Sequence, residues 1–171
     1  ADADAARRLA AVAPLAAERG VRVLLETHDS HRTGADAARV LGPVGHRQIG
    51  ALWDVLHSWL GGEEPADAHA ALAPHLGYVQ VKDVASAEDR TPLPLGAGAV
   101  PLAAVLDTLS QDPAGAHGPV PAPEGTYDQG AGGWLCWEYE KRWYPEAAGL
   151  PDLLAPGRIH LQRLLDGPAA S

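Results

Sequence analysis

The stretch DADAARRLAAVAPLAAERGVRVLLE, residues 2–26, decides the fold class. Its first part predicts a helix over residues 3–19, because apolar side chains recur at helical spacing and Gly20 is a common helix stop. The next six residues, 21–26, form a short apolar run that is typical of a buried strand. A helix followed at once by such a strand indicates a parallel α/β sheet.

The same alternation recurs three more times along the chain. Helices are expected over residues 35–41, 65–76, 100–109 and 156–165, and strands over residues 49–54, 78–83 and 134–139. Together with the first helix and strand, this pattern gives four strands, each preceded and followed by a helix. We therefore predict an α/β fold whose strands are parallel.

One segment interrupts the alternation. Residues 111–133 are rich in Gly and Pro and show neither helical nor strand periodicity. Connections between helices and strands usually have about 2–6 residues, so this segment is interpreted as an inserted loop. The chain as a whole, residues 1–171, is expected to form a single domain.

Composition excludes several classes of protein. The chain has 171 residues, with 13 Lys and Arg against 22 Asp and Glu, and a formal net charge of −9. This acidic balance argues against binding to nucleic acid or to an anionic membrane surface. The single cysteine, Cys136, excludes an internal disulfide, and the sequence has neither a long apolar run nor the pattern of a signal peptide. A cytoplasmic protein is expected.

An oxygen-bearing side chain occurs at or near the end of every predicted strand. These residues are Glu26, Asp54, Gln80 and Glu138. The carboxyl ends of parallel strands lie at one edge of a sheet, which is where ligands bind in α/β proteins. A carboxylate among apolar neighbours is unfavourable unless it is paired or binds a metal. Four oxygen donors at one edge therefore predict a site for a divalent cation.

Each of these residues also has a structural interpretation when it is taken alone. Glu26 can begin a loop, Asp54 can cap the segment that follows it, and Gln80 can be a hydrogen-bonded core amide. Glu138 can pair with a basic neighbour, and Glu140 shares its face of the strand. Strand alternation leaves Glu138 and Glu140 both open as the ligand, and Glu138 is preferred because it lies deeper in the predicted strand.

Five motifs, taken in order, resemble the xylose isomerase-like TIM-barrel superfamily of sugar phosphate isomerases and epimerases. The motifs are LLETHDSH (24–31), ALWDVLHSW (51–59), YVQVKD (78–83), PLGAGAVPL (94–102) and WLCWEYEKRWYPE (134–146). The resemblance implies a TIM-barrel fold of alternating strands and helices. Each motif is weak alone, but the ordered series is fairly specific.

The resemblance also implies a metal site. In that family the last four strands supply Glu, Asp, His and Glu to one divalent metal, here expected to be Mn, Mg, Co or Zn. Those positions correspond to Glu26, Asp54, Gln80 and Glu138. Gln80 stands where most members have His, and a neutral amide is a weaker donor than imidazole.

The activity implied is that of a sugar isomerase or epimerase in carbohydrate metabolism. The metal would act as a Lewis acid on a hydroxycarbonyl sugar and stabilise an enediolate. Glu26 and Glu138 would be the catalytic residues that remove and return the proton. His57, Arg90 and Trp53 would bind the substrate.

The number of predicted strands is too small for a complete barrel. A closed barrel has eight strands and about 250 residues, whereas four strands are predicted in this chain. We therefore expect the C-terminal half of a TIM barrel, with the N-terminal half supplied by missing sequence, a second chain or a homo-oligomer.

Three alternatives to the isomerase remain. A metal-dependent dehydratase or lyase acting on a polyol or keto-sugar would begin with the same proton removal. A non-catalytic half-barrel that needs a partner chain would bind without reacting. The apurinic endonuclease branch of the fold is disfavoured by Gln80 and by the charge of −9, which opposes binding to a phosphate backbone.

Overall fold

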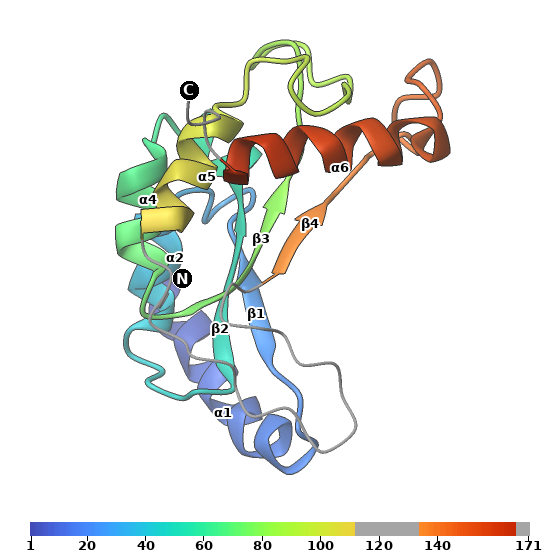
Figure 1. The fold of residues 1–171 in the computed structure, drawn as a ribbon. Coiled ribbons are helices and arrows are strands. Elements are labelled where there is room, and N and C mark those ends of the chain that lie inside the picture. Colours follow the sequence, from blue (N-terminus) through green and yellow to red (C-terminus); the bar gives the residue numbers. More distant parts are fainter. Residues whose placement is uncertain (112–133, 167–171) are drawn as a thin grey trace.

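The computed structural model describes residues 1–111 and 134–166. At its centre lies a sheet whose four strands follow one another in chain order and pair in parallel (Figure 1). The strands are β1 (Val23–Glu26), β2 (Ile49–Asp54), β3 (Leu76–Val81) and β4 (Trp134–Trp137). The predicted α/β class and the parallel sheet are confirmed.

The helices lie mainly on one side of this sheet. Those in the described ranges are α1 (Asp2–Glu18), α2 (Gly34–Leu41), α3 (Val55–Leu60), α4 (Pro65–Leu72), α5 (Leu102–Gln111) and α6 (Leu150–Asp166). Figure 1 shows α2, α4 and α5 side by side along the sheet, with α1 next to α2 and α6 next to α5. No helix within residues 1–111 or 134–166 covers the opposite face (Figure 1).

Local sequence signals explain where several helices begin and end. Gly20 follows α1 with a φ of 63°, a left-handed conformation that costs glycine little. Thr33 precedes α2 and forms a capping box with Asp36, in which each side chain accepts the backbone N–H of the other residue. Pro65 lies in the first turn of α4, where its missing N–H is not needed.

The main apolar core lies between the sheet and the helices. Trp53 of β2 is fully buried there, and it belongs to one cluster with Val79 and Val81 of β3 and with residues from α2 and α4. Because successive side chains of a strand point to opposite faces, the residues between these core positions point away from the helices. The helix-free face of the sheet therefore carries the polar residues.

Three of the differences from the sequence-based expectation concern helices in the first half of the chain. The helix α3 was not predicted, and it begins directly after β2 because the Asp54 side chain caps it. The predicted helix over 65–76 ends at Leu72, since β3 already begins at Leu76. On α1 the buried side chains include Ala13 and Ala16, whereas larger apolar residues of that helix remain exposed.

The inserted loop expected over residues 111–133 lies almost wholly outside the described residues, since Gln111 closes α5 and residues 112–133 are not described. Within the described part, no helix combines the length and apolarity required to cross a bilayer.

Candidate active site

The ends of the four strands bring polar residues to one edge of the sheet. β1 ends at Glu26 and β2 at Asp54, while Lys82 and Glu138 directly follow β3 and β4. Pairing continues beyond β4, because the backbone N–H of Glu138 donates to the carbonyl of Val81 at 3.0 Å. In parallel strands, residues in register share a face, so these side chains project together from the helix-free side.

Three of the four predicted ligands form a compact group, here called the carboxylate cluster: Glu26, Asp54 and Glu138. Each offers one carboxylate oxygen, and these three oxygens lie within 4.8 Å of one another. Asp54 is fully buried and the other two are half-buried. The structure thus brings together carboxylates from β1, β2 and the end of β4, which are far apart in the sequence.

Gln80 lies beside this cluster. It is in register with Asp54 in the pairing of β2 with β3, so both side chains are on the same face of the sheet, and Gln80 is buried. Its amide is therefore placed to add a neutral oxygen donor to the three carboxylates.

Asp54 is held in place through its backbone and one of its two carboxylate oxygens. Oδ1 accepts the N–H groups of Leu56 at 2.9 Å and His57 at 3.4 Å, which caps α3. The hydroxyl of Thr27 accepts the Asp54 N–H at 2.8 Å and donates to the Asp54 carbonyl at 3.1 Å. This leaves Oδ2 as the oxygen that faces the cluster.

Lys82 is a site residue that the sequence analysis did not select. Its side chain is only 4% exposed, and Nζ lies 2.8 Å from Oδ2 of Asp54 and contacts Oε2 of Glu138. Glu140 Oε2 is 4.0 Å from the same nitrogen. The signal was present in the sequence, because Lys82 follows Gln80 by two residues and therefore shares its face.

Burial is the largest cause of the pKa shifts of Asp54 and His57. It raises the pKa of Asp54 to about 6, against the opposing effect of the Lys82 ammonium. It lowers the pKa of His57 to about 4, and the nearby His28 acts in the same direction. Both shifts show that these groups lie in a poorly hydrated part of the molecule.

His57 lies at the margin of the carboxylate cluster. Its Nε2 atom is 4.0 Å from Oδ2 of Asp54, and its ring lies against that of His28 with 3.8 Å between centroids. The contact follows from the fold, because His28 comes two residues after the end of β1 and His57 lies in the helix directly after β2. His57 is thus placed beside any ligand of the cluster.

Arg90, a predicted substrate-binding residue, is in a loop rather than in the cluster. It is exposed and its Nε donates to the Ala87 carbonyl at 3.3 Å. Its charge contributes to the lowered pKa of His57, so the loop lies at the same end of the sheet. Among the described residues, Arg90 forms no ion pair with a cluster carboxylate.

Trp53 does not lie where a substrate-binding residue would. It is fully buried in the core, its indole N–H donates to Oγ of Ser58 at 2.8 Å, and its ring lies 6.3 Å from that of His69. The reason is alternation along β2, since Trp53 precedes Asp54 by one residue and so points to the helices. In the structure Trp53 therefore faces the core and not the carboxylate cluster.

Asp83 anchors the loop that follows β3. Its Oδ2 accepts the N–H groups of Gly96 at 2.8 Å and Gly98 at 2.9 Å, while Oδ1 accepts those of Val84 and Val100. A Cβ atom at Gly98 would clash with Asp83 and with the Val84 carbonyl, so only glycine fits there. These bonds fold the GAG turn of residues 96–98 back onto the end of β3.

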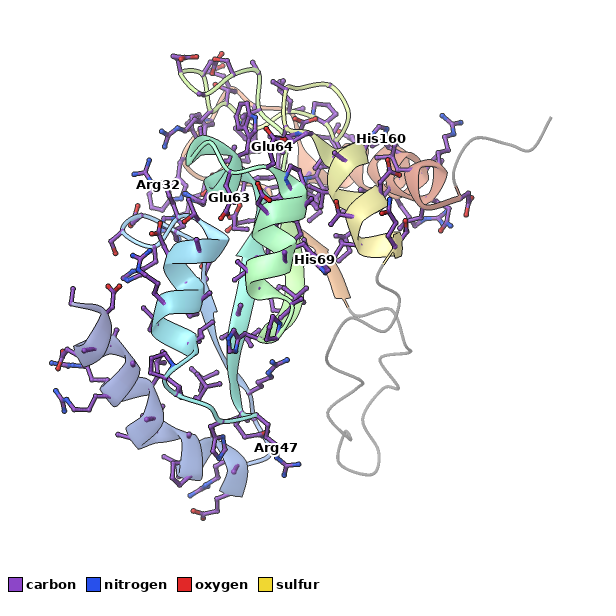
Figure 2. All side chains as sticks on the ribbon, turned by 90° about the vertical axis from the view of Figure 1, so that its left-hand side faces the viewer. Arg32, Arg47, Glu63, Glu64, His69 and His160 are labelled. Carbon is purple, nitrogen blue, oxygen red and sulfur yellow. The ribbon has the colours of Figure 1, made fainter. Side chains whose placement is uncertain are left out.

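The far side of this loop rests on the helix layer. Figure 2 shows His160 on α6, and its ring fills the space beside Gly96 that a Cβ atom would need.

Figure 2 also shows Glu63 and Glu64 near the start of α4. Glu63 accepts the N–H groups of Gly34 and Ala35 at the start of α2, so it has a structural role outside the site.

The cluster residues suit a divalent metal ion. Oδ2 of Asp54 and Oε2 of Glu138 are buried and have no hydrogen-bond donor in good geometry among the described residues, although both face the Lys82 ammonium. Hard cations such as Mg²⁺ and Mn²⁺ prefer carboxylate and amide oxygens, which are the donors present here. Glu26, Asp54, Gln80 and Glu138 are the residues that would hold such an ion.

A parallel sheet with polar residues gathered at the carboxyl ends of its strands is the arrangement of TIM-barrel enzymes. The chain belongs to the xylose isomerase-like TIM barrel family, whose model matches residues 1–122. The resemblance deduced from the five motifs is thus confirmed at the level of the family.

Individual relatives agree with this assignment. Over 83 residues, or 47% of the chain, the sequence is 31% identical to the 3-dehydroshikimate dehydratase of Bacillus anthracis, of which it covers 30%. The fold matches the probable 3-DHS dehydratase AsbF from the same organism, with a TM-score of 0.70, 20% identity, and coverage of 92% of this chain and 55% of that one. It also matches an L-ribulose 3-epimerase, with a TM-score of 0.68, 18% identity, and coverage of 94% and 52%.

The matched structures are longer than this chain. The chain spans about half the length of the solved structures that it matches, 55% of one and 52% of the other.

Proposed function

We propose that this chain carries the metal-binding half of a lyase that removes water from a β-hydroxy ketone of the 3-dehydroshikimate type. The observation that carries the proposal is the Lys82 ammonium beside Asp54 and Glu138, which places an N–H acid within a group of candidate metal ligands. The 31% identity to a dehydratase over 83 residues supports the same reaction.

The proposed reaction has two bond changes. The carbon next to the carbonyl loses a proton, and the C–O bond at the β carbon breaks, so that the hydroxyl leaves as water. A divalent cation, when bound by the carboxylate cluster and Gln80, would supply a Lewis acid that polarises the carbonyl and acidifies the neighbouring C–H.

The chain's own residues have distinct parts in this reaction. Glu26 forms no ion pair with any residue that the structure describes, so its carboxylate is free to accept the proton. Lys82 donates a proton to the departing hydroxyl and recovers it from Glu26 after water has left. His57, fixed by its contact with His28, orients a substrate hydroxyl.

A second candidate is the sugar isomerase or epimerase. Two carboxylates of the cluster come from the two outer strands of the sheet, since Glu26 ends β1 and Glu138 follows β4. This placement favours the second candidate. Carboxylates that approach from opposite sides of the cluster suit removal of a proton by one and its return by the other, through an enediolate. The fold match with an L-ribulose 3-epimerase supports this alternative.

One assay separates the two reactions. The Mn²⁺-loaded chain is incubated in D₂O with 3-dehydroshikimate and, separately, with a ketohexose, and the compounds are followed by mass spectrometry. Loss of one water from 3-dehydroshikimate supports the lyase. Deuterium entering the ketohexose without loss of water supports the isomerase or epimerase instead, and no change in either compound contradicts both.

We also propose that the chain corresponds to the C-terminal half of the barrel and that further parallel strands complete the sheet at both edges. The strand order leaves β1 and β4 with one unpaired side each within the described residues, and the matched structures are about twice as long. The extra strands would come from missing sequence, a second chain or a second copy. Native mass spectrometry with hydrogen exchange tests this, because a monomer whose outer β1 and β4 amides are protected would contradict it.

A further inference from the structure

Lys82 occupies the position that a cation in the carboxylate cluster would need. Its Nζ lies 2.8 Å from Oδ2 of Asp54 and contacts Oε2 of Glu138, and the side chain is almost completely shielded from water. These are the same two buried oxygens that have no hydrogen-bond donor in good geometry among the described residues. The ammonium is therefore the counter-ion of these oxygens in the structure.

The other oxygens of these residues offer no substitute. Oδ1 of Asp54 already accepts the N–H groups of Leu56 and His57 at the start of α3. A metal ion bound by Asp54 would therefore use Oδ2, the oxygen on which Lys82 now rests. An ammonium and a divalent cation repel each other, which disfavours the binding of both to this oxygen at once.

A second acceptor lies within reach of the ammonium. Oε2 of Glu140 is 4.0 Å from Nζ, and Glu140 follows Glu138 by two residues on the connection after β4. Glu140 is half-buried and is not a member of the cluster. A small rotation of the flexible lysine side chain would exchange Asp54 and Glu138 for Glu140.

We propose that Lys82 is a displaceable counter-ion of the metal site, which neutralises Asp54 and Glu138 in the metal-free protein and moves to Glu140 when a divalent cation binds. This inference rests on the proposed metal-dependent function. It gives Glu140 the role of holding the displaced ammonium beside the cluster rather than that of a ligand, and from there Lys82 still serves as the acid of the proposed reaction. It also makes Lys82 a determinant of metal affinity.

The test measures Mn²⁺ binding by electron paramagnetic resonance and thermal unfolding, neither of which requires turnover. We expect Lys82→Met to bind Mn²⁺ at least about tenfold more tightly than the wild type, because the competing charge is gone. We also expect it to unfold at a lower temperature without metal, because buried carboxylates then lack a counter-ion. Added Mn²⁺ should restore the lost stability.

Glu140→Gln tests the second half of the proposal. In the wild-type background it should weaken Mn²⁺ binding by about three- to tenfold, because the displaced ammonium loses its acceptor. In the Lys82→Met background the same change should have no effect on affinity. Arg19→Met is the matched control, since it removes one exposed positive charge before β1, at the opposite end of the sheet.

The outcomes distinguish this inference from the proposed function. Equal or weaker Mn²⁺ binding by Lys82→Met, with binding by the wild type, overturns the inference and leaves the metal-dependent function standing. Mn²⁺ binding by Lys82→Met but not by the wild type supports the inference and contradicts the proposed metal-dependent function of the wild type. Binding by neither protein contradicts both. If Lys82→Met does not fold, Lys82→Gln retains a polar side chain without the charge, and the same outcomes apply.

Discussion

The Nζ atom of Lys82 lies 2.8 Å from Oδ2 of Asp54, and both side chains are buried at the carboxyl edge of the sheet. Desolvation of two charges often exceeds the attraction between them, so such a pair is weak evidence for a stabilising role. Here the pair lies among two further carboxylates, Glu26 and Glu138, at the edge where α/β proteins bind ligands. A role in ligand binding or catalysis therefore explains the Asp54–Lys82 pair better than a contribution to folding stability.

Asp54→Asn should separate the capping role of this residue from its charge. The amide oxygen can still cap α3, and the variant carries no buried charge at this position. Because burial raises the pKa of Asp54 to about 6, the free energy of unfolding of the wild type should fall between pH 4 and 7 by about 1–3 kcal/mol more than that of the variant. Urea denaturation measures this change. Asp107→Asn, an exposed position on α5, is the control and should leave stability unchanged within about 0.5 kcal/mol.

Gly98→Ala should loosen the loop anchored by Asp83. The new methyl group would displace the Asp83 carboxylate and the Val84 carbonyl, so we expect a loss of about 1–3 kcal/mol. Gly149→Ala is the matched control, because the nearest atom to its added Cβ lies at 3.6 Å, an ordinary contact. Equal stabilities of the two variants would show that Asp83 does not constrain the loop.

The pH dependence of stability should contain two opposing contributions. The pKa of His57 falls from 6.5 to about 4 on folding, so its contribution to stability is present above pH 6.5 and is lost as the pH falls towards 4. The pKa of Asp54 rises from 3.8 to about 6, so its contribution is present below pH 3.8 and is lost as the pH rises through 6.

His57→Gln should expose the Asp54 contribution. Between pH 4 and 6 the variant should lose stability with rising pH more steeply than the wild type, which thermal unfolding across this range measures. His46→Gln, which removes a histidine at the other end of β2, is the control. Parallel curves for wild type and His57→Gln would contradict the burial of His57.

Trp53→Phe tests the position of this residue in the core. Loss of the hydrogen bond to Ser58 and of part of the buried ring should destabilise the protein by about 1–3 kcal/mol, with Mn²⁺ affinity unchanged. Trp143→Phe, on an exposed ring, is the control. A Trp53→Phe protein that keeps its stability but binds Mn²⁺ with altered affinity would show that Trp53 belongs to the site.

Alternation along strands explains how much of the site was predictable. Glu26, Asp54, Gln80 and Glu138 were selected because parallel strands end at one edge, and the structure places them on one face. The same rule already placed Trp53 on the opposite face and Lys82 on the site face. The positions of these two residues were missed because residues were grouped by motif rather than by their place along the strand.

The remaining differences depend on tertiary contacts. The helix α3 needs the Asp54 cap, whose geometry appears only once β2 has ended, and the role of Asp83 depends on N–H groups up to 17 residues away in the chain. The apolar residues Val12 and Leu15 belong to the helical pattern of α1 but are exposed. Their environment depends on which elements pack beside α1, which sequence periodicity does not specify.

The central claim is that Glu26, Asp54 and Glu138 form a divalent-metal site, and Mn²⁺ binding to the chain tests it most directly. A titration followed by the electron paramagnetic resonance signal of free Mn²⁺ should show one equivalent bound by the wild type, and binding at least about tenfold weaker in Glu26→Gln. Glu64→Gln, an exposed carboxylate at the start of α4, should bind like the wild type. Absence of binding by the wild type, or equal binding by Glu26→Gln, would contradict the account.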